Sequence, residues 1–524
     1  MSPRSLTHSS RWFYASVAIV ACLILSPVRS AADQAASPPN VLFIAVDDLK
    51  PLIGAFGDEH AVTPHMDRLA ARGIAFLNAH CQQAVCAPSR VSLLTGLRPD
   101  TTKVWDLKTQ FRAALPDVVT LPQRFKQAGY DAVGMGMIYD PRSAGGRNKM
   151  DEASWSEPFH NIDAPASRTF SYLNPQTVAT IEARRAEITD MPKRYDLQLK
   201  AIFPDGKPST DRADVPDNAY HDGAMTDVAV ERLGEYRDNG KPFFLAVGFK
   251  KPHLPFNAPE QYWQLYDRDA LPVAEYTQAP EGAPDFATQP GWELRTNYDA
   301  PREGEISMAK QRELIHGYYA ATSYIDAQVG RLLDALEANG QNDNTIVVLW
   351  GDHGWHLGDH DIWCKHTNYE QATRSPLIVA APGIGRAGTK SLAPVEFVDI
   401  YPTLLDLASL EAAGELHGVS LRPIMDDPSV WVKDIAVSQY PRGGGKNAWM
   451  GYAFRSDRYR LVQWYAMNAK KGDTQGPLAA SELYDYETDP LETRNLIDDP
   501  AYAEVRADME VKAERYRSAM SSNP

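Results

Sequence analysis

An unbroken apolar run that ends in two acidic residues constrains the fold of this chain more than any other feature. Residues 40–48 read NVLFIAVDD. A strand that is buried on both faces has this pattern, because neither face turns toward water. Such strands occur in parallel sheets that helices cover on both sides. The run therefore predicts an α/β fold in which Asp47 and Asp48 directly follow a buried strand.

Strands and helices alternate along most of the chain. Further strands are predicted at 74–76, 130–136, 243–248 and 345–350, and helices at 63–73, 120–129 and 311–338. This alternation predicts a large mixed, mostly parallel sheet sandwiched by helices, within a domain of residues 33–390. Later segments are short strands (431–440, 449–454, 459–464) followed by a helix (501–520). They predict a smaller C-terminal α+β subdomain, residues 391–524. Two stretches rich in Pro and acidic residues, 205–217 and 278–305, are predicted to be loops.

Residues 1–32 have the pattern of a secretory signal peptide. Arg4 and Arg11 precede the apolar run 12–25, and small residues follow it. The run is short for a spanning helix, and no second stretch approaches membrane length. We therefore expect a secreted or periplasmic protein with no membrane span after signal cleavage. A retained N-terminal anchor is the alternative.

Net charge and cysteine content limit the function further. The formal net charge is -15, which gives no indication of a nucleic-acid partner. Without the signal peptide the chain keeps Cys81, Cys86 and Cys364. Three cysteines are too few for a disulfide framework, and the odd number leaves one thiol for another role. A disulfide between Cys81 and Cys364 is open, since an exported protein permits one.

Polar clusters follow three predicted strands, at Asp47-Asp48, at Lys250–His253 and at Asp352-His353. Ligands of open α/β sheets bind at the carboxyl ends of the strands. The three aspartates offer the oxygen ligands that Ca²⁺ or Mg²⁺ prefers. Surface ion pairs are the alternative reading of these acids.

The segment Cys86-Ala87-Pro88-Ser89-Arg90 is the most informative motif. Pro88 can begin a helix that Gly96 ends, so that Cys86 lies at a helix N-terminus. Backbone N–H groups and the helix dipole favour negative charge there. A buried structural thiol is the alternative reading of the motif on its own.

Taken with its context, this motif resembles that of the sulfatase family of the alkaline phosphatase superfamily, and the iduronate-2-sulfatase branch most closely. The likeness spans nearly the whole chain after the signal peptide. It includes residues 82–90, 251–256, 352–358, 438–442 and parts of 482–496. The resemblance implies a hydrolase of sulfate monoesters that acts on a sulfated carbohydrate.

The resemblance also implies a modified nucleophile. In sulfatases the motif cysteine is oxidised to formylglycine, so a formylglycine-generating or cysteine-oxidising maturation enzyme would be a partner of Cys86. The hydrate of this aldehyde carries two hydroxyls. One attacks sulfur and the alcohol leaves; the second then loses its proton, and collapse to the aldehyde expels sulfate. Covalent catalysis of this kind divides one hard displacement into two easier steps.

Residue roles follow by the same resemblance. Arg90 would hold the hydrate oxygen and offset the carboxylates, whereas His253 and Lys365 would contact the sulfate and the leaving oxygen. One Ca²⁺ ion is the expected cofactor; the imidazole among its ligands leaves Mn²⁺ and Zn²⁺ open by residue type. The expected metal-site residues are Asp47, Asp48, Cys86, Asp352 and His353.

The chain departs from the family pattern after the strand at 130–136. Met137 stands where the resemblance predicts a sulfate-binding lysine, and Asp140 where it predicts a histidine that bonds the formylglycine hydroxyl. Asp140 could act as a base for the second hydroxyl, or it could repel sulfate. Lys108 and Lys250 are candidates to supply the missing positive charge.

Two other functions remain open at this point. The first is hydrolysis of phosphate or phosphonate esters, which the same metal and nucleophile would suit and toward which Met137 could shift the preference. The second is a pseudoenzyme that binds sulfated glycans without turnover. The intact Cys86–Arg90 motif argues against a pseudoenzyme, since binding alone does not need it.

Overall fold

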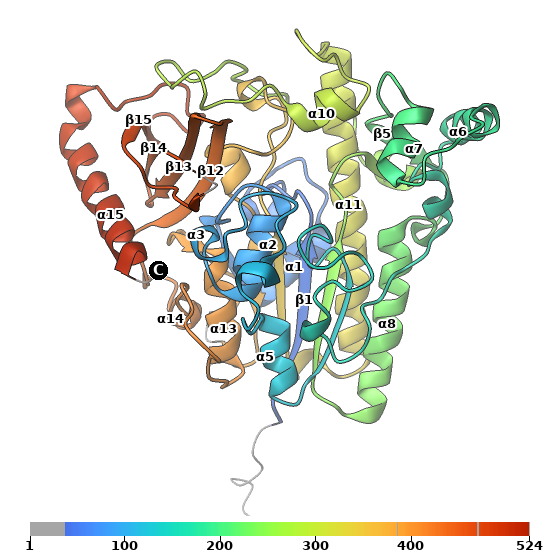
Figure 1. The fold of residues 1–524 in the computed structure, drawn as a ribbon. Helices are drawn as coiled ribbons and strands as arrows, with labels where there is room; N and C mark the ends of the chain where they lie inside the picture. Colours follow the sequence, from blue (N-terminus) through green and yellow to red (C-terminus); the bar gives the residue numbers. More distant parts are fainter. Residues whose placement is uncertain (1–36, 385, 469–470, 523–524) are drawn as a thin grey trace, which may run out of the picture. The chain divides into compact units, whose positions relative to one another are not determined.

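The computed structural model describes residues 37–384, 386–468 and 471–522. From residue 38 onward, the described residues belong to one compact unit (Figure 1). The predicted signal peptide, residues 1–32, lies outside the described residues. In the described part of the chain, no helix has both the length and the apolar character needed to cross a membrane.

A seven-stranded sheet forms the centre of this unit, in the strand order β10-β2-β9-β8-β1-β6-β4. β1 lies between β6 and β8 and runs parallel to both, and β4 runs parallel to β6. β9 is antiparallel to its neighbours β2 and β8. The predicted mixed, mostly parallel sheet is confirmed. Its strands are β1 (Asn40–Val46), β2 (Ile74–Phe76), β4 (Asp131–Gly136), β6 (Phe243–Phe249), β8 (Thr345–Gly351), β9 (Leu377–Ala380) and β10 (Thr389–Ser391).

Helices cover both faces of this sheet, as predicted (Figure 1). Alternate residues of β1 point to opposite faces because the side-chain period of a strand is two. Val41, Phe43 and Ala45 join one buried core with three helices, α2 (Cys86–Thr95), α5 (Leu121–Gln127) and α13 (Ile400–Leu407). The intervening residues of β1 join a second core with α1 (Pro64–Arg72), α8 (His221–Asn239) and α11 (Met308–Ala338). The strand is thus buried on both sides.

A second, antiparallel sheet with a terminal helix confirms the predicted C-terminal α+β subdomain. Its elements are β12 (Ala436–Gly444), β13 (Asn447–Arg455), β14 (Tyr459–Ala466), β15 (Leu478–Asp485) and α15 (Ala503–Ser522). The first strand begins later than the sequence predicts, and β15 is an addition to the prediction. β10 belongs to the large sheet and spans residue 390, so the exact boundary of the subdomain stays a prediction.

A buried ionic cluster, which we call the Glu370 cluster, ties the second sheet to the loop that follows β8. Glu370 begins α12 (Glu370–Thr373). Its Oε2 accepts hydrogen bonds from Arg455 Nε, at 3.1 Å, and from Arg460 Nη2. Arg460 also donates from Nη1 to the carbonyl of Asn368, at 2.6 Å. Two strands of the second sheet therefore hold the segment just after Lys365.

Both predicted loops contain regular structure, so these predictions are wrong in part. β5 (Thr210–Ala213) pairs with β7 (Phe256–Pro259), and α10 (Trp292–Asn297) lies inside 278–305. Gln289 Oε1 accepts the N–H of Gly291 at 2.7 Å and of Trp292 at 3.0 Å. A side chain from outside the helix thus satisfies the first backbone donors of α10. The sequence did not predict this helix, because its residues show no apolar periodicity. Other short elements include α3 (Pro99–Thr102), α4 (Phe111–Ala114), α6 (Pro175–Glu187), α7 (Tyr195–Ile202), α9 (Glu260–Trp263), α14 (Arg422–Asp426), β3 (Ala79–His80) and β11 (Val395–Glu396).

Candidate active site

The carboxyl ends of β1 and β8 bring two acidic segments together. Asp47 and Asp48 follow β1, and Asp352 and His353 follow β8. Val46 lies opposite Gly351 in the parallel register of these strands, so the segments leave the sheet side by side. The N–H of Asp48 donates to Asp352 Oδ1 at 2.9 Å. Strand pairing over a sequence distance of 304 residues thus builds this part of the site.

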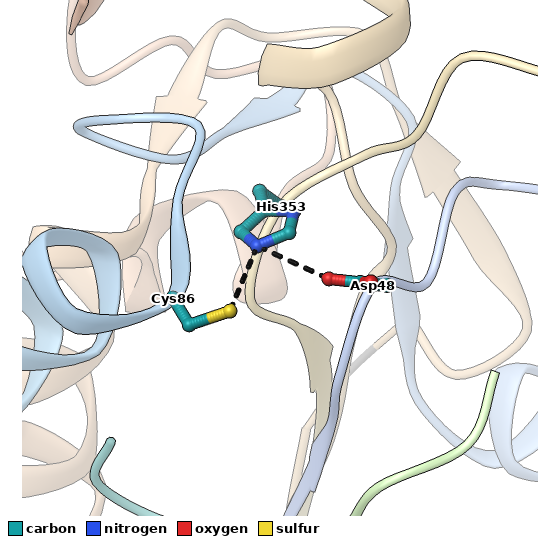
Figure 2. Close-up of side chains that lie close together, drawn as sticks. All are labelled: Asp48, Cys86 and His353. Atoms are coloured by element: carbon teal, nitrogen blue, oxygen red, sulfur yellow. Dashed lines mark hydrogen bonds and ion pairs between the residues drawn. The ribbon is translucent and has the colours of Figure 1, made fainter. Parts of the chain in front are cut away.

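Cys86 is the first residue of α2, which ends at Gly96 with φ 71°. This helix starts two residues before Pro88. Cys86 Sγ lies 3.5 Å from His353 Nε2, and His353 lies between the thiol and Asp48 (Figure 2). Burial and the carboxylate of Asp47 raise the pKa of the thiol well above its ordinary value. As an unmodified thiol, Cys86 is therefore protonated and not activated as a nucleophile.

All five predicted metal-site residues come together in two overlapping groups that share Cys86. One group is Asp48, Cys86 and His353, and the other is Asp47, Cys86 and Asp352. Within each group the potential ligand atoms lie no more than 4.8 Å apart, and every residue is buried. The structure therefore places the residues of the predicted site around a common point.

The donor atoms of this cluster fit a divalent cation. Asp47 Oδ2 is buried without a hydrogen-bond partner in the described chain. His353 Nδ1 donates to the carbonyl of Gly354 at 2.9 Å, which leaves the Nε2 lone pair facing Asp48 Oδ1 at 3.4 Å. Burial, with the nearby charge of Lys365, lowers the pKa of His353 to about 3, so the ring is neutral. A neutral imidazole fixed through its other nitrogen is the usual form of a metal-ligating histidine.

Arg90 supplies the fixed positive charge behind these carboxylates. Its Nε donates to Asp352 Oδ2 at 3.0 Å and its Nη2 to Asp47 Oδ1 at 2.9 Å. Its Nη1 donates to the carbonyl of Ile138 at 3.3 Å and to that of Met137. Burial opposes the charge, but the two aspartates outweigh this effect and raise the pKa of the guanidinium. Arg90 is therefore held by its partners as a counter-charge to the aspartates.

Lys365 and His253 both lie near Asp48. Lys365 Nζ lies 2.8 Å from Asp48 Oδ1 and 2.8 Å from Glu293 Oε2. His253 Nε2 lies 3.2 Å from Glu293 Oε1 and 3.8 Å from Asp48 Oδ2, while its Nδ1 donates to the carbonyl of Leu254 at 2.6 Å. Burial, with the charge of Lys365, lowers the pKa of His253 to about 3. Lys365 stays charged, because Asp48 and Glu293 outweigh burial and raise its pKa.

Glu293 is a site residue that the sequence did not reveal. It belongs to α10, inside the stretch predicted to be a loop. Burial would raise its pKa, but Lys365 and His253 outweigh this effect and hold the pKa well below the ordinary value. Glu293 therefore stays a carboxylate that bridges the two predicted catalytic side chains. No motif surrounds it, and one acid among several in that stretch gives no signal of its own.

The altered segment after β4 lies at the same edge of the sheet. Met137 N donates to the carbonyl of Gly248 at 2.7 Å, which extends the pairing of β4 with β6 by one residue. Asp140 is buried and accepts from Arg142, with Nε–Oδ1 at 2.9 Å and Nη2–Oδ2 at 2.6 Å. The carboxylate of Asp140 is thus engaged in a two-point ion pair with Arg142, which the sequence did not indicate.

Two hollows open onto the site and share Arg142 and His253 in their walls. The larger hollow has a volume of about 610 Å³ and is lined by Asp47, Met137, Asp140, Arg147 and Lys250, among others. The smaller hollow, about 430 Å³, is lined by Cys86, Lys207, Trp292, Glu293 and Lys365, among others. Cationic side chains thus face the space around the cluster in a chain whose net charge is strongly negative.

The predicted thiols are not paired. Cys81, Cys86 and Cys364 are all free and buried, so the disulfide that the sequence left open is not formed. Cys364 Sγ accepts from Gln289 Nε2 at 2.7 Å. Their place in the sequence, with Cys81 shortly before Cys86 and Cys364 beside Lys365, predicts that both border the pocket of Cys86. Neither contributes to the walls of the two hollows, so this prediction is wrong.

Comparison of the sequence with known families gives two matches. The family described as Sulfatase matches residues 39–410. The family described as N-sulphoglucosamine sulphohydrolase, C-terminal, matches residues 358–519. Among individual proteins, iduronate 2-sulfatase of Homo sapiens is 32% identical over 524 aligned residues, covering 88% of this chain and 91% of the human protein.

Solved structures show the same fold over almost the whole chain. A protein solved in complex with its substrate, D-glucosamine-2-N,6-O-disulfate, superposes with a TM-score of 0.68 at 22% identity, covering 93% of this chain and 99% of that one. A phosphonate monoester hydrolase from Silicibacter pomeroyi superposes with a TM-score of 0.67 at 24% identity, covering 92% of this chain and 95% of that one.

Proposed function

This chain belongs to the sulfatase family of sulfuric ester hydrolases, and we propose that it hydrolyses sulfate monoesters of carbohydrates with Cys86, as formylglycine, at the reacting centre. One observation carries the proposal. Cys86 begins a helix at the point where four buried metal-type ligands meet, with Lys365 and His253 beside them. A structural thiol would need none of these neighbours.

Asp47, Asp48, Asp352 and His353, with the modified Cys86, would hold one Ca²⁺ ion. Three carboxylates form the hard oxygen set that this cation prefers. When bound, the cation would neutralise charge on a sulfate oxygen and lower the pKa of a hydroxyl beside it. The unpartnered Oδ2 of Asp47 and the free Nε2 face of His353 support such an ion.

Lys365 and His253 then serve the leaving-group side. Lys365 carries its proton on Nζ because Asp48 and Glu293 hold it charged. It can therefore offer that proton, or its charge, to the alcohol oxygen as the ester bond breaks. His253 presents Nε2, since its Nδ1–H is bonded to the carbonyl of Leu254. By the family resemblance this nitrogen would contact the sulfate or the leaving oxygen, and it needs a proton to donate to either.

The two hollows suit an anionic sugar. Arg147 and Lys250 line the larger hollow, where they can meet a carboxylate or a second sulfate. Trp292 lines the smaller hollow with 48% of its surface exposed, and an exposed indole offers a flat apolar face to a sugar ring. We therefore place a sulfated uronate or a related algal sugar unit among the expected substrates.

Export and maturation complete the proposal. The signal pattern of residues 1–32 supports a secreted or periplasmic location. A maturation enzyme would oxidise Cys86, and the burial of this side chain favours oxidation before folding is complete.

Mass spectrometry of the Cys86 peptide from the native host, together with sulfate release from sulfated mono- and disaccharides, tests the function. We expect an aldehyde at Cys86 and sulfate release that Cys86→Ala abolishes. An unmodified thiol in fully active protein would contradict the mechanism.

Hydrolysis of phosphate or phosphonate esters is the second candidate. Met137 is the observation behind it, because the sulfate-binding lysine that the resemblance predicts is absent at this position. Rates on matched sulfate, phosphate and phosphonate esters decide between the two. Phosphonate or phosphate turnover without sulfate release would establish the second function.

A further inference from the structure

The segment after β4 lacks the lysine and the histidine that the family resemblance predicts, but it contains an ion pair between Asp140 and Arg142. Asp140 does not point into the hollow as a free base, because its side chain is only 1% exposed and both its oxygens accept from Arg142. The backbone N–H of Arg142 donates to the same Oδ1 at 2.9 Å. This carboxylate therefore fixes both the turn and the direction of the Arg142 guanidinium.

Arg142 faces the site with most of its donors unused. A guanidinium has five N–H donors, and Asp140 accepts one from Nε and one from Nη2. In the described chain Nη1 has no hydrogen-bond partner, and 55% of the side chain is exposed. Arg142 lines the larger hollow and also the smaller one, where Cys86 lies. Its guanidinium is near enough for the charges of Cys86 and Glu293 to act on it.

The other cations are placed less well for this role. Lys108 is exposed and lines neither hollow. Lys250 lines only the larger hollow. Lys207 shares the smaller hollow with Cys86, but its ammonium lies over the ring of Tyr298, 4.3 Å from the ring centroid. Burial, with the charge of Lys250, lowers the pKa of Lys207 to about 8. Lys207 therefore begins to lose its positive charge near neutral pH, whereas an arginine keeps its charge.

We propose that Arg142 supplies the sulfate-contacting positive charge in place of the absent lysine, and that Asp140 is the positioning residue that aims it. This inference rests on the proposed function for its ligand, a sulfate ester. Asp140 and Arg142 thus act as one unit: the carboxylate takes one edge of the guanidinium, and the opposite edge is left for the anion. Planar two-point recognition of this kind suits arginine better than lysine.

Two readouts on the same variants test the inference. The first is the affinity for inorganic sulfate by calorimetry, which needs no turnover. The second is kcat/KM on a sulfated sugar with formylglycine verified at Cys86. We expect Arg142→Gln to lower kcat/KM on the order of a hundred-fold, the usual loss for one donor to transition-state charge, and to weaken sulfate binding. For Arg142→Lys, both kcat/KM and sulfate affinity should lie between those of Arg142→Gln and the wild type. For Lys108→Gln, both should equal those of the wild type.

Rescue tests the role of Asp140. Asp140→Asn should lower kcat/KM while sulfate binding weakens, because the guanidinium loses its charged anchor. Adding Met137→Lys and Asp140→His to Arg142→Gln rebuilds the pair that the family resemblance predicts. That triple variant should regain about tenfold or more in kcat/KM over Arg142→Gln, or ~1.4 kcal/mol in barrier. A residue that only stabilises the fold would not be rescued by new charges.

The outcomes separate this inference from the function itself. Unchanged sulfate affinity and unchanged kcat/KM in Arg142→Gln would overturn it, whatever the effect of Lys207→Gln. If the verified wild type releases no sulfate from any ester yet binds sulfate through Arg142, the proposed function fails and the anion site stands. Arg142 is more than half exposed, so its replacement leaves the core intact, and circular dichroism of each variant checks the fold.

Discussion

Replacing Arg90 by methionine should lower the free energy of unfolding of the protein, and it should also abolish activity. Arg90 is fully buried and spans Asp47 and Asp352 at 2.9 and 3.0 Å, and both carboxylates are at most 1% exposed. Arg90→Met keeps the length of the side chain but leaves two buried carboxylates without their counter-charge. Breaking one buried ion pair in this way typically costs about 3–5 kcal/mol. We therefore expect a loss of at least about 3 kcal/mol in the free energy of unfolding.

The proposed cation gives this prediction a second, sharper part. A divalent ion bound by Asp47 and Asp352 would itself offset their charge, so the loss should be larger in chelator than in excess Ca²⁺. At a Ca²⁺ concentration of about 100 times Kd, binding to the folded state alone adds about 2.7 kcal/mol. The uncompensated carboxylates of Arg90→Met should bind Ca²⁺ more tightly than those of the wild type, so the ion should stabilise the variant more and its deficit should shrink when Ca²⁺ is added.

Urea unfolding of the wild type and the variant, with and without chelator, measures both parts. Arg68→Met is a matched control, since Arg68 pairs with Asp334 at 2.6 Å on the surface, with 39% and 59% of the two side chains exposed. Exposed pairs contribute about 0–1 kcal/mol. If Arg90→Met in chelator unfolds within about 1 kcal/mol of the wild type, the reasoning about this buried pair is refuted.

Three further predictions follow from the site. Chelation and Asp47→Ala should each abolish sulfate release, and full activity of the metal-free protein would exclude the cluster from catalysis. Glu293→Gln should lower kcat/KM about tenfold or more, since it removes the carboxylate that holds Lys365 and His253; unchanged kinetics would show that Asp48 alone suffices. Lys207, with its pKa lowered to about 8 by burial and by Lys250, should lose its charge above that pH. KM for an anionic substrate should then rise through pH 8 and stay flatter in Lys207→Arg, whereas identical profiles would remove Lys207 from binding.

The sequence predicted the parts of the site that follow strands or lie in motifs. Residues 40–48 have no polar face, so their burial and the position of Asp47 and Asp48 at a strand end were readable. The same holds for Asp352 after β8. The position of Cys86 could be predicted because Pro88 in the first turn of the helix and Gly96 at its end leave little freedom in its placement. These signals are local in the sequence. The parallel pairing of β1 with β8 then brings the predicted residues together.

Residues that act through long-range partners could not be predicted in this way. Glu293 matters because α10 places it between Lys365 and His253, and α10 itself forms with the help of Gln289. Asp140 was ambiguous for a similar reason. The role of the Asp140 carboxylate depends on its ion pair with Arg142, two residues later. In an irregular segment, a two-residue spacing does not predict the direction of either side chain.

The Glu370 cluster has a consequence for how the protein comes apart. Arg455 and Arg460 hold the segment that begins just after Lys365, and the partners on both sides are buried. Loosening the second sheet would remove Arg455 and Arg460, the closest counter-charges of the buried Glu370, and would free the segment after Lys365 from its anchor. The two sheets are therefore expected to melt in one calorimetric transition, and a proteolytic cut in the C-terminal region should lower the melting temperature of both.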